Sequence, residues 1–312
     1  MGIRPETPGR ALRIGTAVHE LLHLIKTGHD INGELPGLDG YDLSDLEMAA
    51  VSAMVRGWVW RWETDPVEVL HSEHTYRVKL TNPVSSYPMR DWRAAGQIDG
   101  IVNWQGKCVV MEHKTCGEDI SPAAHYWERL RMDLQCSNYH TAALELGYPV
   151  EGVLYDVIRK PVMTQRQVPL LDSDGLKVVL DGEGNRVLKS DGTPRQTPDK
   201  SQGWELQSRE ETPQEWHDRV LSDIYDRPDY YYQRRLVPRL HSDLVEAAHD
   251  NVGWVEMIKH LRNKNSWPRN TSACTDFGGC PYQYICANGI DVTQEVPDGF
   301  VFVDDLHPEL RD

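Results

Sequence analysis

The segment CVVMEHK (residues 108–114) joins an apolar run to three ionisable side chains, and the segment GQIDG (residues 96–100) supplies another carboxylate upstream. The apolar residues of both segments predict interior strands of a sheet. Because strand side chains alternate between the two faces, Glu112 and Lys114 point to one face and His113 to the other. We therefore expect buried strands that carry Asp99, Glu112 and Lys114.

These three residues form a D…ExK pattern with a specific chemistry. A pair of carboxylates can hold a hard cation such as Mg²⁺, and an adjacent ammonium can orient the attacking water or stabilise a pentavalent phosphate. That is the chemistry of phosphodiester cleavage. The apolar flanks argue against a solvated strand face, because charges are seldom buried unless they are paired or bind a metal. A buried structural ion pair remains the alternative.

Length and charge limit the class of protein. The chain of 312 residues is 39% hydrophobic, which is enough for one large or two modest domains with a real core. The sequence contains neither a membrane-length apolar run nor an N-terminal secretory signal, so we expect a cytoplasmic protein without a membrane span. A net charge of −15 argues against a surface coated in basic residues, so any contact with nucleic acid must be focused.

Periodicity and turn residues predict a mixed α/β fold. Ser44 and Glu47 form a capping-box pattern at the start of the second predicted helix. The expected elements are a helix over 11–26, a helix over 44–62, a strand over 67–80, two strands that carry Asp99 and Glu112 and are joined at Gln105-Gly106, a helix from Ser121-Pro122 to Gly147, a strand over 150–158, and helices over 212–224 and 242–261.

A change to polar sequence divides the chain. Residues 162–210 contain three Asp-Gly pairs between short β-like runs, which predict a hairpin insertion rather than a calcium loop, because the ligand spacing of a calcium loop is missing. The predicted organisation is a core with the candidate site at 1–161, the polar β-hairpin insertion at 162–210, and a helical C-terminal part of the same domain with a cysteine-containing tail at 211–312.

The run YYYQRR (residues 230–235) places aromatic side chains beside arginines. Tyr231 and Tyr232 could stack on bases while Arg234 and Arg235 hold phosphates, which is how single strands are bound without sequence readout. The alternative is a half-buried strand with solvated arginines.

The first predicted helix carries a competing motif. His19, Glu20 and His23 match HExxH, in which two histidines bind zinc and the glutamate acts as general base. His29 lies where a third zinc ligand would stand in metzincin proteases, but Lys26 replaces the glycine of that pattern. A zinc metalloprotease is therefore one alternative function, and a non-catalytic DNA-binding or scaffold protein is another.

The ordered set of motifs resembles the RecB-like exonuclease branch of the PD-(D/E)XK nuclease superfamily. The set consists of GTAVH (residues 15–19), Asp99, EHK (residues 112–114) and QCSNY (residues 135–139). The resemblance covers residues 14–161 and returns at the C-terminus. It implies a mixed central β-sheet flanked by helices, as in restriction-endonuclease cores, and a Mg²⁺- or Mn²⁺-dependent deoxyribonuclease.

The resemblance also implies a role for each matching residue. His19, Asp99, Glu112 and the backbone carbonyl of His113 would bind the metal, and Lys114 would position or activate the water. Gln135 and Tyr139 match a QxxxY element that orients the catalytic groups and the DNA strand. Glu73 would support this set from the preceding strand.

The tail places Cys274, Cys280 and Cys286 close together in sequence. It resembles the C-terminal cysteine cluster of iron–sulfur members of this branch, which include CRISPR-adaptation nucleases and AddB-type helicase–nucleases. In those proteins a fourth cysteine lies upstream of the histidine-bearing helix, whereas the first cysteine here is Cys108. Three thiolates leave a [4Fe–4S] cluster incomplete unless another ligand contributes, so we favour a packing role over a cluster, with zinc as a further alternative.

The combined expectation is exonucleolytic hydrolysis of DNA at single strands or duplex ends, during recombination or end processing, in a phage or mobile-element setting. Because no segment resembles a base-reading module, sequence-specific cutting is not expected. A recombination or helicase protein is a possible partner by the same resemblance.

Overall fold

The computed structural model describes residues 2–29, 38–305, 307 and 310. Its centre is a five-stranded mixed sheet with the order β12-β7-β6-β5-β2. These strands are β2 (Glu68–His71), β5 (Gly100–Trp104), β6 (Lys107–Cys116), β7 (Gly152–Arg159) and β12 (Tyr232–Pro238). β6 and β7 run parallel and the other neighbours run antiparallel. The predicted mixed α/β fold is confirmed.

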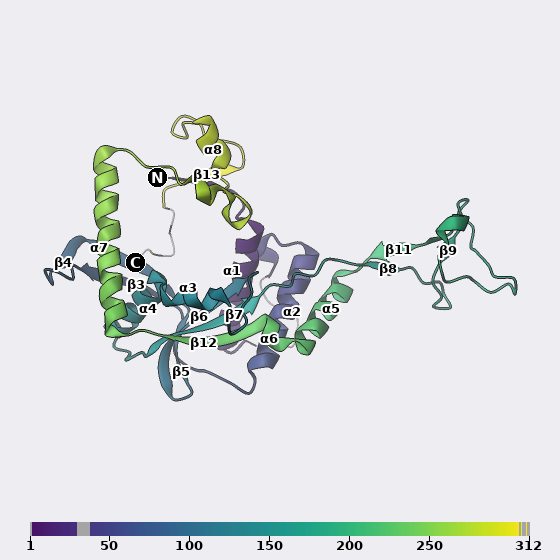
Figure 1. The fold of residues 1–312 in the computed structure, drawn as a ribbon, viewed down its shortest axis with the longest axis horizontal. Coiled ribbons are helices and arrows are strands. Elements are labelled where there is room, and N and C mark those ends of the chain that lie inside the picture. Colours follow the sequence, from purple (N-terminus) through teal and green to yellow (C-terminus); the bar gives the residue numbers. More distant parts are fainter. Residues whose placement is uncertain (1, 30–37, 306, 308–309, 311–312) are drawn as a thin grey trace.

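Helices cover both faces of this sheet (Figure 1). One core lies under α1 (Arg10–Lys26), α2 (Asp45–Trp62) and α5 (Pro213–Asp226), and the other lies under α3 (His125–Arg131) and α4 (Leu134–Glu145). Within β6, Val109 and Met111 belong to the first core and Val110 belongs to the second. Burial of both faces explains why the strand reads as a continuous apolar run.

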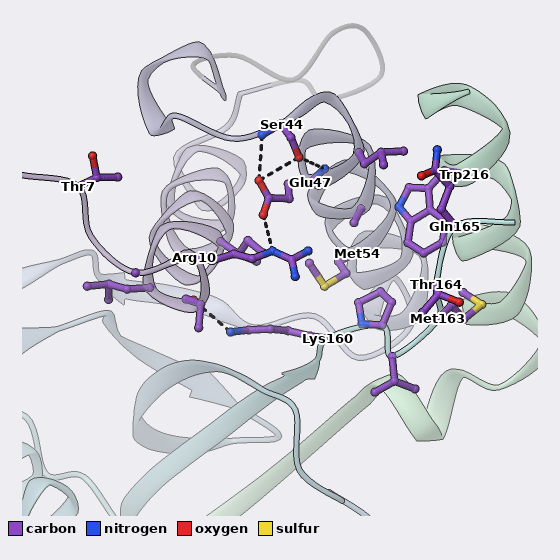
Figure 2. Close-up of a pocket in the computed structure, with 18 of the residues that line it drawn as sticks. Thr7, Arg10, Ser44, Glu47, Met54, Lys160, Met163, Thr164, Gln165 and Trp216 are labelled. Carbon is purple, nitrogen blue, oxygen red and sulfur yellow. Dashed lines mark hydrogen bonds and ion pairs between the residues drawn. The ribbon is translucent and has the colours of Figure 1, made fainter. Parts of the chain in front are cut away.

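The helix boundaries follow local chemistry near the start of the chain. Ser44 and Glu47 form the predicted capping box of α2, and Glu47 also pairs with Arg10 of α1 (Figure 2). The first helix ends at Lys26, as the predicted helix over 11–26 does, and Gly28 just beyond it has a positive φ that favours glycine. Residues 30–37, which follow, lie outside the described residues.

The predicted single strand over 67–80 is wrong. The chain forms two strands there, β2 in the central sheet and β3 (His74–Thr81), which pairs with β4 (Pro88–Ile98) in a separate two-stranded sheet. His71 pairs with Ile101, whereas His74 pairs with Ile98. The segment β2–β3 and its partner segment β4–β5 therefore pass from the central sheet to the two-stranded sheet at the same level. Asp99 lies at this bend, between β4 and β5.

The predicted helix from 121 to 147 is also wrong in its continuity. Residues 121–124 form a turn, α3 ends at Arg131, and α4 begins after Asp133, whose carboxylate accepts the Gln135 N–H at 2.8 Å. Arg239 stabilises the break, because its guanidinium donates to the carbonyl oxygens of Leu130, Arg131 and Asp133. The break places Gln135 in the first turn of α4.

The hairpin insertion and the helical C-terminal region are both present. The insertion extends from the body as a long arm (Figure 1), whose strands are β8 (Gln167–Pro169), β9 (Val179–Leu180), β10 (Glu205–Leu206) and β11 (Ser208–Glu210). The C-terminal region contains α6 (Pro228–Tyr231), α7 (His241–Lys264), α8 (Gln283–Asn288) and β13 (Phe300–Val303), which pairs with β1 (Gly2–Pro5). None of the described helices has the length and apolarity needed to cross a membrane.

A buried charge network lies where β6, β7 and β12 meet on the α2 side of the sheet. The Asp156 carboxylate is fully buried and accepts from Trp58 Nε1 at 2.8 Å and from Arg234 Nη2 at 3.1 Å. Arg234 also donates to the backbone oxygen of Asp65 at 2.8 Å, and its side chain is 1% exposed. Arg234 therefore compensates the buried charge of Asp156.

We predict that Asp156→Ala lowers the free energy of unfolding by about 3–5 kcal/mol, because it leaves the Arg234 charge buried and unpaired. The matched control is Asp229→Ala, which removes the partner of Arg61 from a pair whose aspartate side chain is 77% exposed. The control should cost below about 1 kcal/mol. Urea denaturation followed by circular dichroism measures both costs, and equal costs would contradict the network.

Candidate functional site

The predicted site residues converge at the bend between β4 and β5. Asp99 occupies the bend, β6 supplies Glu112, His113 and Lys114, α1 supplies His19, and α4 supplies Gln135 and Tyr139. Two groups of contacts lie next to each other: one joins His19, Asp99 and the His113 backbone, and the other joins Lys114, Glu112, Tyr139 and Gln135. The two groups are linked by the adjacent residues Glu112 and His113 of β6. The structure thus places the seven predicted residues near one another, while their role as a functional site stays a prediction.

Asp99 connects the bend to β6 and to α1. Its Oδ2 accepts the His113 backbone N–H at 2.8 Å and lies 3.6 Å from Nδ1 of His19. Burial alone would raise the pKa of Asp99, but the hydrogen bond and charge of His19 and the His113 N–H hold this pKa well below its usual range. Asp99 is therefore a stable carboxylate at neutral pH.

A close helix–strand approach sets the position of His19. A Cβ atom at Gly15 would lie 3.2 Å from Oγ1 of Thr115 on β6, so glycine permits α1 to pack tightly against that strand. His19 follows one turn later on α1 and is about one-third exposed, with a side-chain accessibility of 32%. The GTAVH segment thus places an accessible imidazole over the end of β6.

Glu112 is the buried carboxylate of the site, with 2% of its surface exposed. Its Oε1 lies 2.5 Å from Nζ of Lys114 and accepts from the Tyr139 hydroxyl at 3.4 Å. Gln135 Nε2 in turn donates to the Tyr139 hydroxyl at 2.8 Å. Among the described residues, Oε2 of Glu112 has no hydrogen-bond partner. Burial and the negative charge of Asp99 raise the pKa of Glu112 to about 7, against the opposing effect of Lys114.

Lys114 remains protonated in this setting. Burial opposes its charge, but the carboxylates of Glu112 and Asp99 outweigh burial and raise the pKa of Lys114 above its usual value. The side chain is 33% exposed, so its ammonium also reaches the open side of the site. Lys114 can therefore donate hydrogen bonds and positive charge, but it is not prepared to accept a proton.

His113 contributes its backbone to the site and its side chain to the opposite face. Its Nδ1 lies 3.4 Å from Oδ2 of Asp156, and burial together with the charge of Lys26 lowers its pKa. The ladder between β5 and β6 ends at the pair Gly100 and Met111. Because N–H and C=O of a residue in an antiparallel strand point to the same neighbour, the His113 carbonyl lies on the edge that faces Asp99.

Lys26 and the Asp156 network are site features that the sequence analysis missed. Lys26 Nζ donates to the backbone oxygen of Asp99 at 3.1 Å, and burial outweighs four nearby carboxylates to lower its pKa. His19, His23 and Lys26 follow a helical i, i+4, i+7 spacing, which could have identified this face. His23 Nδ1 lies 3.9 Å from Oε2 of Glu73, and Glu73 is also one of the carboxylates near Lys26.

The donor set fits a hard divalent cation. Asp99 and Glu112 supply carboxylate oxygens, Oε2 of Glu112 is buried with no hydrogen-bond partner among the described residues, and His19 presents an accessible imidazole. Within the described ranges, no three His, Cys, Asp or Glu side chains are grouped closely enough to hold a metal ion as they stand. The residues that would hold Mg²⁺ or Mn²⁺ are His19, Asp99, Glu112 and the His113 carbonyl.

The three key residues of the HExxH motif do not converge on one point. His19 faces Asp99 and His23 faces Glu73, whereas Glu20 is exposed to solvent. A zinc protease requires that glutamate beside the metal-bound water as its general base. The observed positions therefore favour the carboxylate site over the protease alternative.

The predicted DNA contacts at Tyr231, Tyr232 and Arg234 are wrong. Both tyrosines are fully buried, and Arg234 lies in the Asp156 network. Tyr232 donates to the Met54 backbone oxygen at 2.7 Å, which fixes β12 against α2. Arg235 is exposed, and it donates to the backbone oxygen of Pro122. The alternative of a half-buried strand with solvated arginines is correct only for Arg235, because both tyrosines and the Arg234 side chain are buried. The aromatic and basic composition reflects packing at the sheet edge.

The cysteine tail lies beside the start of the chain. The Cys280 N–H donates to the Cys274 carbonyl at 2.9 Å, and the Tyr282 hydroxyl donates to the Ile3 carbonyl at 3.2 Å. Cys274 and Cys280 are half-buried, whereas Cys286 is exposed, so a packing role does not account for Cys286. Whether the three thiols bind a cluster or zinc stays a prediction.

Two cavities lie beside helices that carry predicted site residues, one at α1 and the other at α4. One of about 1080 Å³ is lined by residues at the start of α1, by α2, by residues 160–165 and by Trp216, with none of the predicted site residues (Figure 2). The other, of about 490 Å³, is lined in part by Gln135 and Tyr139 of α4 and by Gln97 of β4. The second cavity is thus lined by two of the predicted site residues, Gln135 and Tyr139.

Comparison of the sequence with protein-family models gives no match, and a search of curated proteins finds no similar sequence. The assignment of function therefore rests on the residues and on their geometry.

We predict that Glu112→Gln stabilises the metal-free protein at high pH relative to the wild type. Because the folded pKa of about 7 exceeds the ordinary value of 4.5, the wild type loses stability as pH rises through this interval. The advantage of Glu112→Gln should grow by on the order of 2 kcal/mol between about pH 5 and about pH 8. Urea denaturation in EDTA measures this difference, and a difference that shrinks with pH would contradict the argument.

Proposed function

We propose that this protein hydrolyses DNA phosphodiester bonds with the help of Mg²⁺ or Mn²⁺. The observation that carries the proposal is the convergence of Asp99, Glu112 and Lys114, with Oε2 of Glu112 buried and without a hydrogen-bond partner in the described part of the chain. This arrangement combines two carboxylates with a protonated lysine at the end of an interior strand. The combination suits an anionic phosphate substrate that approaches with a divalent cation.

Each residue has a distinct part in the proposed reaction. A bound divalent cation would polarise the phosphate and lower the pKa of the attacking water. The Lys114 ammonium would orient the water and stabilise the negative charge that develops on the phosphate oxygens. Gln135 and Tyr139 hold Oε1 of Glu112 in place through their hydrogen-bonded chain. The phosphorus–oxygen bond to the leaving deoxyribose breaks as the bond to the water oxygen forms.

The expected substrate is a single strand or a duplex end. A cavity lies beside Gln135 and Tyr139, and the sequence suggests no module that would read bases in a groove. Exonucleolytic digestion fits these features better than cutting at a defined sequence.

The principal prediction concerns the lysine. Lys114→Ala should reduce Mg²⁺- or Mn²⁺-dependent degradation of end-labelled DNA by at least about 100-fold, because it removes the charge that stabilises the transition state. Asp99→Asn and Glu112→Gln should abolish degradation, and EDTA should do the same. Gel analysis of the products measures the loss and the polarity of digestion. The matched control is Lys107→Ala on the same strand, where Lys107 pairs with Glu151 away from the site.

A second prediction separates the three functional classes. His23→Ala should leave most DNA degradation intact, because His23 contacts Glu73 and not the two carboxylates of the site. A zinc protease would instead lose casein digestion in His23→Ala and retain it in Lys114→Ala. A scaffold would bind DNA, and would degrade none, in both the wild type and Asp99→Asn. DNA degradation and casein digestion by the same variants therefore distinguish a nuclease, a zinc protease and a scaffold protein.

A further inference from the structure

The β3–β4 hairpin presents a basic face that leads to Asp99. Tyr76, Val78 and Leu80 of β3 are buried, so the alternate residues Arg77 and Lys79 point outward. Arg93 pairs directly with Lys79, and Ala95 pairs with Arg77, so these residues share the outward face. Asp91 is the acidic residue that the alternation of β4 adds to this face.

The basic face ends close to the candidate site. Along β4, Arg93, Ala95 and Gln97 alternate onto one exposed face, so this face extends to Gln97, two residues before Asp99. Six residues at about 3.4 Å each span roughly 20 Å, which is enough for several nucleotides. Gln97 also lines the cavity that contains Gln135 and Tyr139. The basic face thus ends at the cavity beside Gln135 and Tyr139, and Tyr139 donates to Glu112.

We propose that this face, formed by Arg77, Lys79, Arg93 and Gln97, binds the phosphate backbone of a single DNA strand and guides it to the site. The inference rests on the proposed function. Lys79 and Arg93 are exposed, and no ion pair joins either of them to a carboxylate among the described residues. In a chain of net charge −15, such a group of cations is complementary to a polyanion.

A single strand fits this surface better than a duplex. Lys79 and Arg93 lie directly opposite each other on neighbouring strands, which places both charges along one narrow strip. Arg93 Nη1 donates to the carbonyls of Met89, Arg90 and Trp92, and its remaining N–H donors can reach a phosphate. Tyr87, at the turn end of the hairpin, is 76% exposed and offers a ring on which a base can stack.

The test measures binding in EDTA, so it does not depend on cleavage. Fluorescein-labelled oligothymidylate is titrated with wild type, with Lys79→Gln/Arg93→Gln, and with Lys177→Gln/Lys189→Gln, at salt concentrations between about 50 and 200 mM. Lys177 and Lys189 are exposed in the arm, which projects from the opposite end of the molecule to β4 (Figure 1). Each double variant loses two positive charges, so the hairpin variant and the arm variant have the same net charge.

Loss of two phosphate contacts should reduce the slope of log K against log salt by about 1.4, because each contact to a single strand contributes about 0.7. The arm variant should keep the wild-type slope. Lys79→Gln alone should reduce the slope by about 0.7. This single variant keeps the hydrogen bonds of Arg93, so its result holds even if the double variant misfolds. Tyr87→Ala should weaken binding about five- to hundredfold without changing the slope.

The outcomes separate this inference from the proposed function. Equal slopes for the hairpin and arm variants, or a wild type that binds no single strand, would overturn the hairpin as the binding surface. A wild type that binds through Lys79 and Arg93 but degrades no DNA with Mg²⁺ or Mn²⁺ would support the surface and overturn the proposed hydrolysis.

Discussion

The burial of charged side chains at the end of β6 is the constraint on which the rest of the site depends. Both faces of this strand are covered, and Glu112 and His113 are each 2% exposed. A buried ionisable group needs a partner, and the two faces meet that need differently. On the His113 face, the Asp156 carboxylate pairs with Trp58 and Arg234 and lies 3.4 Å from Nδ1 of His113. On the Glu112 face, Lys114 and Tyr139 contact Oε1, and Oε2 has no hydrogen-bond partner among the described residues. A cation bound at Oε2 would compensate the buried charge of Glu112.

The bend at Asp99 has a second consequence for the site. Because the central ladder ends at Gly100 and the hairpin ladder begins at Ile98, Asp99 is free to turn its carboxylate onto the His113 N–H. A straight strand would have used that N–H for a backbone bond and would have directed Asp99 by simple alternation. The division of one long hairpin into two sheets therefore creates the position of the first carboxylate.

Local sequence patterns predicted the elements, and they failed where tertiary contacts decide the geometry. The capping box at Ser44 and the apolar periods of α1, α2, α5 and α7 depend on residues within one helix, so they could be found. The break before Asp133 depends on Arg239, which is over a hundred positions away. The charge of Arg234 suggested a surface, but pairing with Asp156 made burial possible. Composition alone could not distinguish a paired arginine from an exposed one.

The distribution of charge relates the acidic composition to the proposed substrate. A net charge of −15 repels DNA over most of the surface, and the paired carboxylates at the site repel phosphate at short range. Two features oppose this repulsion: the divalent cation that the carboxylates would hold, and the basic face of the β3–β4 hairpin that ends beside them. Salt screens charges separated by more than about 8–10 Å, so the distant negative surface matters less than these neighbouring groups. Attraction limited to one narrow path would admit a strand from one direction, which is the geometry that digestion from an end requires.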